Sequence, residues 1–188
     1  MAEPATPKVD FHDTGQGPAL LFVPGSFSTS TAWRGIQQHL PSGFRFVGTS
    51  LCGYGATNET RTHGDLDMDH QTRVIETVAS RINQPVHLVG HSFGGTVALA
   101  TALSGKVDIL SISTFEANPF NIIDTPENGA LFQNAKQVAD AFENAYHANE
   151  HNAPGRIIDY WGGDGSFLSL PDPVQDYCRA TAHTNILD

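Results

Sequence analysis

The sequence is poor in positive charge. It holds 10 Lys and Arg residues against 20 Asp and Glu residues, which gives a formal net charge of -10 at pH 7. A chain with this balance is repelled by a nucleic-acid backbone and by an anionic lipid surface. We therefore expect neither a nucleic-acid partner nor a membrane partner.

Cysteines and long apolar runs are scarce as well. The two cysteines, Cys52 and Cys178, make neither a disulfide framework nor a metal-ligand pattern. No apolar run approaches the roughly 18 residues of a membrane-spanning helix, and residues 1–8 lack the apolar core of a signal peptide. These absences predict no metal site, no cofactor and a location in a reducing cytoplasm.

The order of apolar runs and helical patterns predicts an α/β fold. With 188 residues, of which 39% are hydrophobic, the chain can bury one good-sized core. Short apolar runs alternate with helical patterns, which is typical of strand–helix units around a mostly parallel sheet flanked by helices. The predicted strands cover 9–12, 19–23, 44–49, 86–89 and 108–115, and the predicted helices cover 32–40, 69–82 and 96–103.

The chain changes character after Phe115. No further strand pattern follows, and Asn, Pro and Gly interrupt the next segment. Apolar residues then recur at helical spacing, with Pro126 expected in the first turn, at Leu131, Ala135, Val138, Phe142 and Ala145. A second amphipathic stretch starts at Pro173. We therefore divide the chain into an α/β core, 1–118, and a helical segment, 119–188.

A reactive serine is predicted between the strand 86–89 and the helix 96–103. Residues 90–94 match the pattern Gly-x-Ser-x-Gly, with Ser92 at its centre. Glycine pairs arise by chance in a chain with 18 glycines, but the position between a strand and a helix favours a nucleophile. Such a turn lifts the Ser92 hydroxyl above the sheet and directs the Phe93 amide at a developing oxyanion.

A second oxyanion donor is expected in the loop after the strand 19–23. Pro24, Gly25 and Ser26 follow that strand directly, and we expect the Ser26 amide to be the donor. His91 is expected to pack beside Ser92 without taking part in the reaction. Phe27 and Trp33 are predicted to line an apolar substrate pocket together with Phe93.

Three separated motifs resemble the N-terminal part of the α/β-hydrolase family. They are the loop 23–26 with Trp33 a turn later, the segment Leu-Cys-Gly-Tyr-Gly at 51–55, and the elbow 90–95. The resemblance covers about 11–120 and implies an α/β-hydrolase fold, an acyl-enzyme on Ser92 and a small-molecule ester or acyl substrate. It also implies that 119–188 is a helical cap. Pro24 stands where the family often has His, and Ser50 where it often has Asp.

A serine nucleophile needs a histidine base and a carboxylate that orients this base. In the family, the acid and the histidine follow the serine in that order. Glu116, at the end of the strand 108–115, is the candidate acid, although a carboxylate there can also cap a helix or lie in solvent. Of the three histidines after Ser92, His147, His151 and His183, none is expected to be buried beside the serine. His183 is the candidate base, because it lies where the chain could still return toward the core.

The family's acid and histidine usually follow its last two strands, which this sequence does not supply. The strand 108–115 is then a sheet edge, open to self-association or to a complementing chain. The alternatives to an ester hydrolase are a catalytically impaired pseudo-hydrolase or small-ligand-binding module, and a truncated chain that needs a complementing C-terminal segment.

Overall fold

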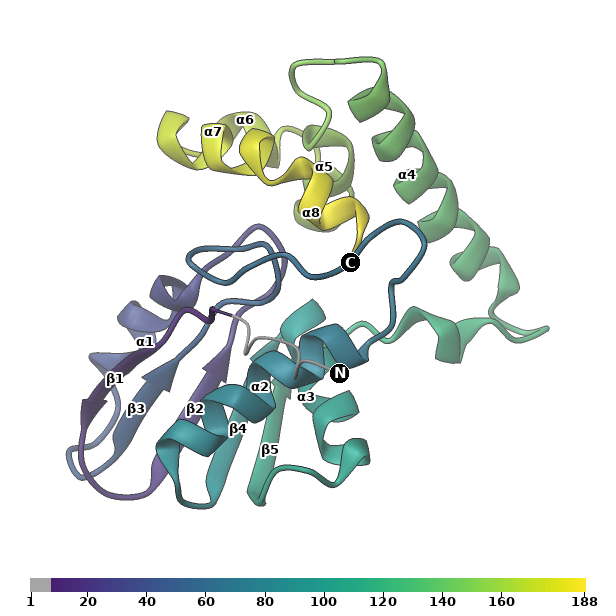
Figure 1. The fold of residues 1–188 in the computed structure, drawn as a ribbon. Coiled ribbons are helices and arrows are strands. Elements are labelled where there is room, and N and C mark those ends of the chain that lie inside the picture. The colour runs from purple at the N-terminus through teal and green to yellow at the C-terminus, as the bar shows by residue number, and fades with distance from the viewer. Residues whose placement is uncertain (1–7) are drawn as a thin grey trace, which may run out of the picture. The chain divides into compact units, whose positions relative to one another are not determined.

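A five-stranded mixed sheet forms the centre of the first part of the chain (Figure 1). The structure is a computed structural model, and it describes residues 8–188. The strand order is β1-β3-β2-β4-β5, where β1 pairs with β3 antiparallel and the other pairs are parallel. The strands are β1 His12–Gly15, β2 Ala19–Val23, β3 Arg45–Gly48, β4 Val86–His91 and β5 Ile109–Phe115. The mostly parallel α/β sheet predicted from the sequence is confirmed.

The first strand begins later than the predicted range 9–12, because Asp10 makes hydrogen bonds outside the sheet. Its amide donates to Thr57 Oγ1 over 2.9 Å, and its carboxylate accepts from Ser50 Oγ over 2.6 Å. Strand pairing starts only at His12, opposite Gly48. The backbone and the carboxylate of Asp10 are thus engaged outside the sheet, and β1 begins after this residue.

The helices of this part follow the predicted order with shifted ends. The predicted helix 32–40 is a 3-10 turn, η1 Ser30–Trp33, followed by the short α1 Arg34–Gln37. Helix α2 Asp69–Ile82 has the predicted bounds, and Asn83 ends it in the left-handed conformation with φ 54°. Helix α3 Phe93–Ser104 starts before the predicted residue 96, directly after Ser92.

The two faces of the sheet bury different side chains. On one face, Phe22 and Phe46 stack with ring centroids 4.3 Å apart, and Trp33 from η1 packs against Phe22. Strand alternation turns Leu21 and Leu88 to the opposite face, which is covered by α2 and α3 (Figure 1). Each fully buried side chain of this size contributes about 1.5–3 kcal/mol to folding.

The loops after β2 and β4 lie at a topological switch point. Strand β2 pairs with β3 on one side and with β4 on the other. The helical segment after β2 and the helix after β4 cover opposite faces of the sheet (Figure 1). The two loops therefore diverge at the carboxyl ends of these strands, where open α/β sheets form their ligand sites.

Strand β5 is an edge of the sheet, as predicted. In residues 8–188 its strand neighbour is β4 alone, and Leu110 and Phe115 are exposed large apolar side chains. An edge strand of this kind offers unpaired backbone groups to another chain. Association at this edge stays a prediction.

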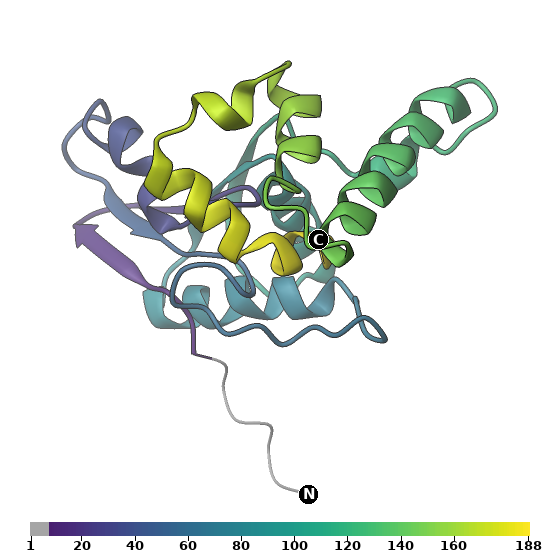
Figure 2. The same ribbon diagram turned by 90° about the horizontal axis from the view of Figure 1, so that it is seen from above.

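The second part of the chain is helical and forms its own compact unit, Pro119–Ile186. It contains η2 Phe120–Ile123, α4 Gly129–His147, α5 Gly155–Gly162, α6 Ser166–Ser169, α7 Asp172–Ala180 and α8 Ala182–Ile186. Helix α4 packs against α5 and α8 (Figure 2). It begins only at Gly129, so the expectation that Pro126 lies in its first turn is wrong.

The last two residues, Leu187–Asp188, belong to the first unit, which differs from the expected segment 119–188. The reason is that Leu187 is buried and Asp188 bonds to side chains of the α/β core. Within residues 8–188, no helix combines the length and the apolar character required to cross a bilayer.

The core packing predicts a stability difference between two leucines. Leu88 on β4 is 0% exposed and Leu103 on α3 is 90% exposed. We expect Leu88→Ala to lower the free energy of unfolding by about 2–5 kcal/mol, because it leaves a cavity in the sheet core. Leu103→Ala, the matched control, should change it by less than about 0.5 kcal/mol in urea titrations. Equal losses would contradict this account of the core.

Candidate active site

Ser92 occupies a sharp turn between β4 and α3. Its backbone has φ 52° and ψ -128°, a conformation that costs a residue other than glycine about 1–3 kcal/mol. The turn is held by backbone bonds, since the Ser92 amide donates to Phe115 over 2.9 Å and its carbonyl accepts from Gly95 over 2.8 Å. The Ser92 hydroxyl makes no hydrogen bond with another residue of 8–188 and does not cap α3. It is therefore free to meet a substrate or a base.

The glycines around Ser92 are required by close backbone packing. A Cβ atom on Gly94 would collide with the carbonyl oxygen of Pro24, and one on Gly90 would lie 2.5 Å from the carbonyl oxygen of Gly94. A Cβ on Gly95 would lie 2.8 Å from the Cβ of Ala117. The motif thus needs glycines at these positions because the start of α3 packs closely against the end of β2.

The loop after β2 lies against the elbow. A Cβ atom on Gly25 would be 3.0 Å from the Cβ of Ser92 and 3.3 Å from His91 Nδ1. The next residue in this loop is Ser26, and Phe93 is the first residue of α3. Neither of their amides donates a hydrogen bond within residues 8–188. Two free amides thus flank Ser92 on adjoining segments, and their role as oxyanion donors stays a prediction.

The candidate acid and the candidate base have other neighbours. Glu116 follows β5 with φ 53°, its side chain is 86% exposed, and its Oε2 lies 3.5 Å from Nε2 of His91. His183 lies on α8 of the helical unit and stacks on Tyr146, with ring centroids 6.1 Å apart. Within the described part of the first unit, no hydrogen bond or ion pair joins Glu116 to Ser92, and His183 belongs to the other unit. Both roles stay predictions.

Of the expected pocket residues, Trp33 is buried in the core cluster with Phe22 and Phe46. Phe27 is half-buried in the loop after β2 and has φ 57°. Their role in lining a substrate pocket stays a prediction. No group of three or more His, Cys, Asp and Glu side chains in the described part of the chain is arranged to hold a metal ion.

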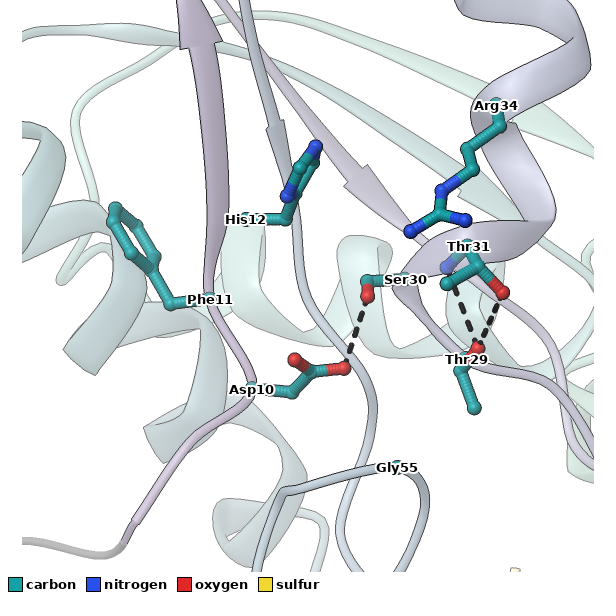
Figure 3. Close-up of a pocket in the computed structure, with 8 residues that line it drawn as sticks. All are labelled: Asp10, Phe11, His12, Thr29, Ser30, Thr31, Arg34 and Gly55. Carbon is teal, nitrogen blue, oxygen red and sulfur yellow. Dashed lines mark hydrogen bonds between the residues drawn. The ribbon is translucent and has the colours of Figure 1, made fainter.

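A polar cavity that sequence reasoning missed lies beside β1 and η1 (Figure 3). Its volume is ≈ 310 Å³, and it is lined by Asp10, Phe11, His12, Thr29, Ser30, Thr31, Arg34 and Gly55. The Asp10 carboxylate accepts from Ser30 Oγ over 2.9 Å, and Ser50 Oγ accepts from the Ser30 amide over 2.9 Å. Asp10 therefore places a carboxylate beside Ser50, and the pair fixes the end of the loop after β2.

A buried ion pair holds the other end of that loop. Ser26 Oγ donates to Asp188 Oδ2 over 2.5 Å, and the Tyr54 hydroxyl donates to the same oxygen over 2.8 Å. Arg61 Nη1 donates to Asp188 Oδ1 over 2.6 Å, and these side chains are 1% and 6% exposed. Sequence reasoning missed this cluster, because no local pattern links residue 188 to residues 26, 54 and 61.

Burial, hydrogen bonds and nearby charges shift the pKa values of Asp188 and Arg61. Burial raises the pKa of the Asp188 carboxyl above its ordinary value, while Arg61, Ser26 and Tyr54 oppose that change. Burial alone would lower the pKa of Arg61, but hydrogen bonds and charges from Glu59 and Asp188 outweigh it and raise that pKa. The guanidinium is therefore protonated, and it compensates the charge of a carboxylate that has almost no access to water.

The elbow packing predicts a difference between two glycines. Gly94→Ala should unfold or strongly destabilise the first unit, since its Cβ would meet the carbonyl of Pro24 at a junction with no room to move. Gly35→Ala is the control, because an added Cβ there has no neighbour within 4 Å. Thermal melting should show a lower midpoint for Gly94→Ala alone. A native midpoint for Gly94→Ala would refute the packing argument.

The buried ion pair predicts a difference between two arginines. Arg61→Met should cost about 3–5 kcal/mol of unfolding free energy, because it leaves Asp188 buried without its counter-charge. The control is Arg73→Met, since Arg73 pairs with Asp69 over 3.9 Å in the solvent and should contribute at most about 1 kcal/mol. Urea unfolding measures both values. A small loss for Arg61→Met would mean that water reaches Asp188.

Comparison with known proteins agrees with this geometry. The model of a family described as "Alpha/beta hydrolase family" matches residues 20–185. The chain is 32% identical over 102 residues to 2-hydroxymuconate semialdehyde hydrolase from Pseudomonas sp. strain CF600. This match covers 51% of this chain and 35% of that protein. It is 31% identical over 105 residues to pimeloyl-[acyl-carrier protein] methyl ester esterase from Aeromonas salmonicida strain A449, covering 56% and 40%.

Solved structures share the fold at lower identity. An epoxide hydrolase from Bacillus megaterium superposes with a TM-score of 0.72 and 18% identity, covering 96% of this chain and 67% of that one. The chain spans well under two thirds of the length of the curated relatives that it matches. The match of the family model over most of the chain, together with the sheet and the elbow, shows that this chain belongs to the α/β-hydrolase family.

Proposed function

We propose that this protein hydrolyses a small carboxylic ester or a related acyl compound through an acyl-enzyme on Ser92. The observation that supports this most is the backbone of Ser92, which has φ 52° and ψ -128° between β4 and α3. A serine is kept in such a strained conformation only where the surroundings enforce it, and that is typical of reactive residues. The free hydroxyl beside Gly25 is where an acyl carbonyl would be attacked.

The reaction proceeds in two steps. Ser92 Oγ bonds to the carbonyl carbon, its proton passes to a base, and the alcohol leaves with a proton; water then releases the acid from Ser92. The amides of Ser26 and Phe93 hold the charge on the carbonyl oxygen in both steps. Each donor of this kind contributes about 3 kcal/mol to the stability of the transition state.

Three parts of the proposal extend the sequence predictions. Glu116 is the candidate acid and His183 the candidate base, while Phe27 and Trp33 line the acyl pocket. The helical unit, Pro119–Ile186, is the cap. The chemistry needs no cofactor, because the nucleophile, the base and the amides all come from the protein.

The names of two relatives support an acyl substrate. One name describes hydrolysis of a methyl ester of a pimeloyl group on acyl-carrier protein, and the other describes hydrolysis of a semialdehyde. We also infer a cytoplasmic location, which the two unpaired, buried cysteines support.

Labelling with a fluorophosphonate tests the nucleophile. The folded chain should gain one phosphonyl group on Ser92, seen by intact mass and peptide mapping, because the probe mimics the attacked carbonyl. Ser92→Ala should gain none. Ser80→Ala, which changes an exposed serine on α2, should react like the unchanged chain.

Two results would overturn the proposal. Equal labelling of Ser92→Ala would place the reactive group elsewhere. A folded, full-length chain that binds small esters but takes up no label would favour the alternative of a ligand-binding module.

A further inference from the structure

We propose that Asp188 and Arg61 are positioning residues for the oxyanion loop, which we define as residues 24–29. They act through the Ser26 hydroxyl, and they set the direction of the Ser26 amide toward the acyl oxygen on Ser92. The inference rests on the proposed function for its catalytic consequence. Its structural part, that the ion pair orders this loop, can be tested without any activity.

The first step of the argument is the contact itself. Ser26 Oγ donates to Asp188 Oδ2 over 2.5 Å, a length typical of a hydroxyl bonded to a charged acceptor. Ser26 directly follows Gly25, the residue whose backbone lies against Ser92. A carboxylate from residue 188 therefore holds the side chain of the residue whose amide would face the oxyanion.

The carboxylate is itself held rigidly. Oδ1 accepts from Arg61 Nη1 over 2.6 Å, while Oδ2 also accepts from the Tyr54 hydroxyl over 2.8 Å. Asn cannot replace this group faithfully, because its single oxygen cannot serve both sets of donors. Both oxygens of the Asp188 carboxylate are therefore needed, Oδ1 for Arg61 and Oδ2 for Ser26 and Tyr54.

The guanidinium is fixed from several directions. Arg61 donates to both carboxylate oxygens of Glu59 over 2.9 Å, to the Cys52 carbonyl over 3.2 Å and to the Leu187 carbonyl over 3.0 Å. Such multiple bonds leave a 1% exposed side chain little freedom. Arg61 also cancels the charge of Asp188, which would otherwise oppose an oxyanion on the neighbouring loop.

The loop needs such support because its own backbone is strained. Phe27 has φ 57°, which a phenylalanine adopts only where neighbouring contacts enforce it. Oxyanion donors act only when held close to their productive position, and a displacement of about 1 Å can cost about 100-fold in rate. Arg61 and Asp188 do not bond to Ser92, so their effect is on geometry.

Hydrogen exchange tests the ordering of the loop. In Ser26→Ala and in Asp188→Asn, those amides of residues 25–29 that exchange slowly in the unchanged chain should exchange about tenfold faster, as expected when one hydrogen bond that holds a segment is lost. The amides of β4 should keep their rates. Matched controls are Ser80→Ala and Asp69→Asn, which change exposed residues of α2. Ser26→Thr keeps the hydroxyl and should restore slow exchange.

The rate of fluorophosphonate labelling tests the catalytic consequence. Ser26→Ala and Asp188→Asn should each lower the maximal labelling rate of Ser92 by about 10- to 100-fold, with the half-saturating probe concentration unchanged. The double variant should be no slower than the slower single variant, because Asp188 acts through Ser26. A merely structural role would instead give multiplied losses in the double variant and a lower melting temperature already in Ser26→Ala, which leaves the ion pair intact.

The outcomes separate this proposal from the proposed function. Faster loop exchange with normal labelling would overturn the positioning role and leave Ser92 as the nucleophile. Unchanged loop exchange in both single variants would overturn it too, as would a uniform rise over β4 and the loop.

If Asp188→Asn fails to fold, Ser26→Ala decides the matter by the same measurements, because it leaves the ion pair intact. A chain without any label refutes the proposed function, and the exchange data then decide the ordering of the loop alone.

Discussion

The close backbone contact between the elbow and the end of β2 is the constraint on which the site depends. Gly94 lies so near the carbonyls of Val23 and Pro24 that a single added carbon would not fit. This contact sets where α3 starts and keeps Ser92 in its strained conformation beside Gly25. Strain of about 1–3 kcal/mol is sustained because the buried sheet around it cannot relax. The reactive geometry is thus a property of the core packing as much as of the serine.

Two carboxylates that are distant in sequence hold the loop after β2. Asp10 bonds to Ser30 and Ser50 where that loop enters η1, and Asp188 bonds to Ser26 near its start. Both carboxylates accept from hydroxyl groups, and these bonds are stronger than those between neutral groups. The loop that faces Ser92 is therefore restrained on both sides, while its own backbone makes few regular contacts. This arrangement suits a segment that must present an amide without moving when charge develops.

The groups of the proposed reaction are divided between the two units. The first unit carries Ser92, the amides of Ser26 and Phe93, and Glu116 at the end of β5, whereas the helical unit carries His183. Within the first unit, Glu116 meets His91 on the surface, and its large exposure leaves it only weakly bound there. Ser92 and the two amides proposed to hold the oxyanion are hence positioned by one sheet.

The sequence by itself determined the strand–helix order, the mostly parallel sheet and the position of the elbow. These features have local signals: the run 19–23 is apolar throughout, residues 69–82 have helical periodicity, and small residues surround Ser92. Only the tertiary structure decided the start of β1, the pairing of Glu116 with His91 and the return of Asp188 to the α/β core. Each of these rests on a polar contact between residues that the fold brings together, and no periodicity or spacing encodes such a contact. A hydrogen bond needs only atoms within about 3 Å, so the chain can supply its two partners from any distance along the sequence.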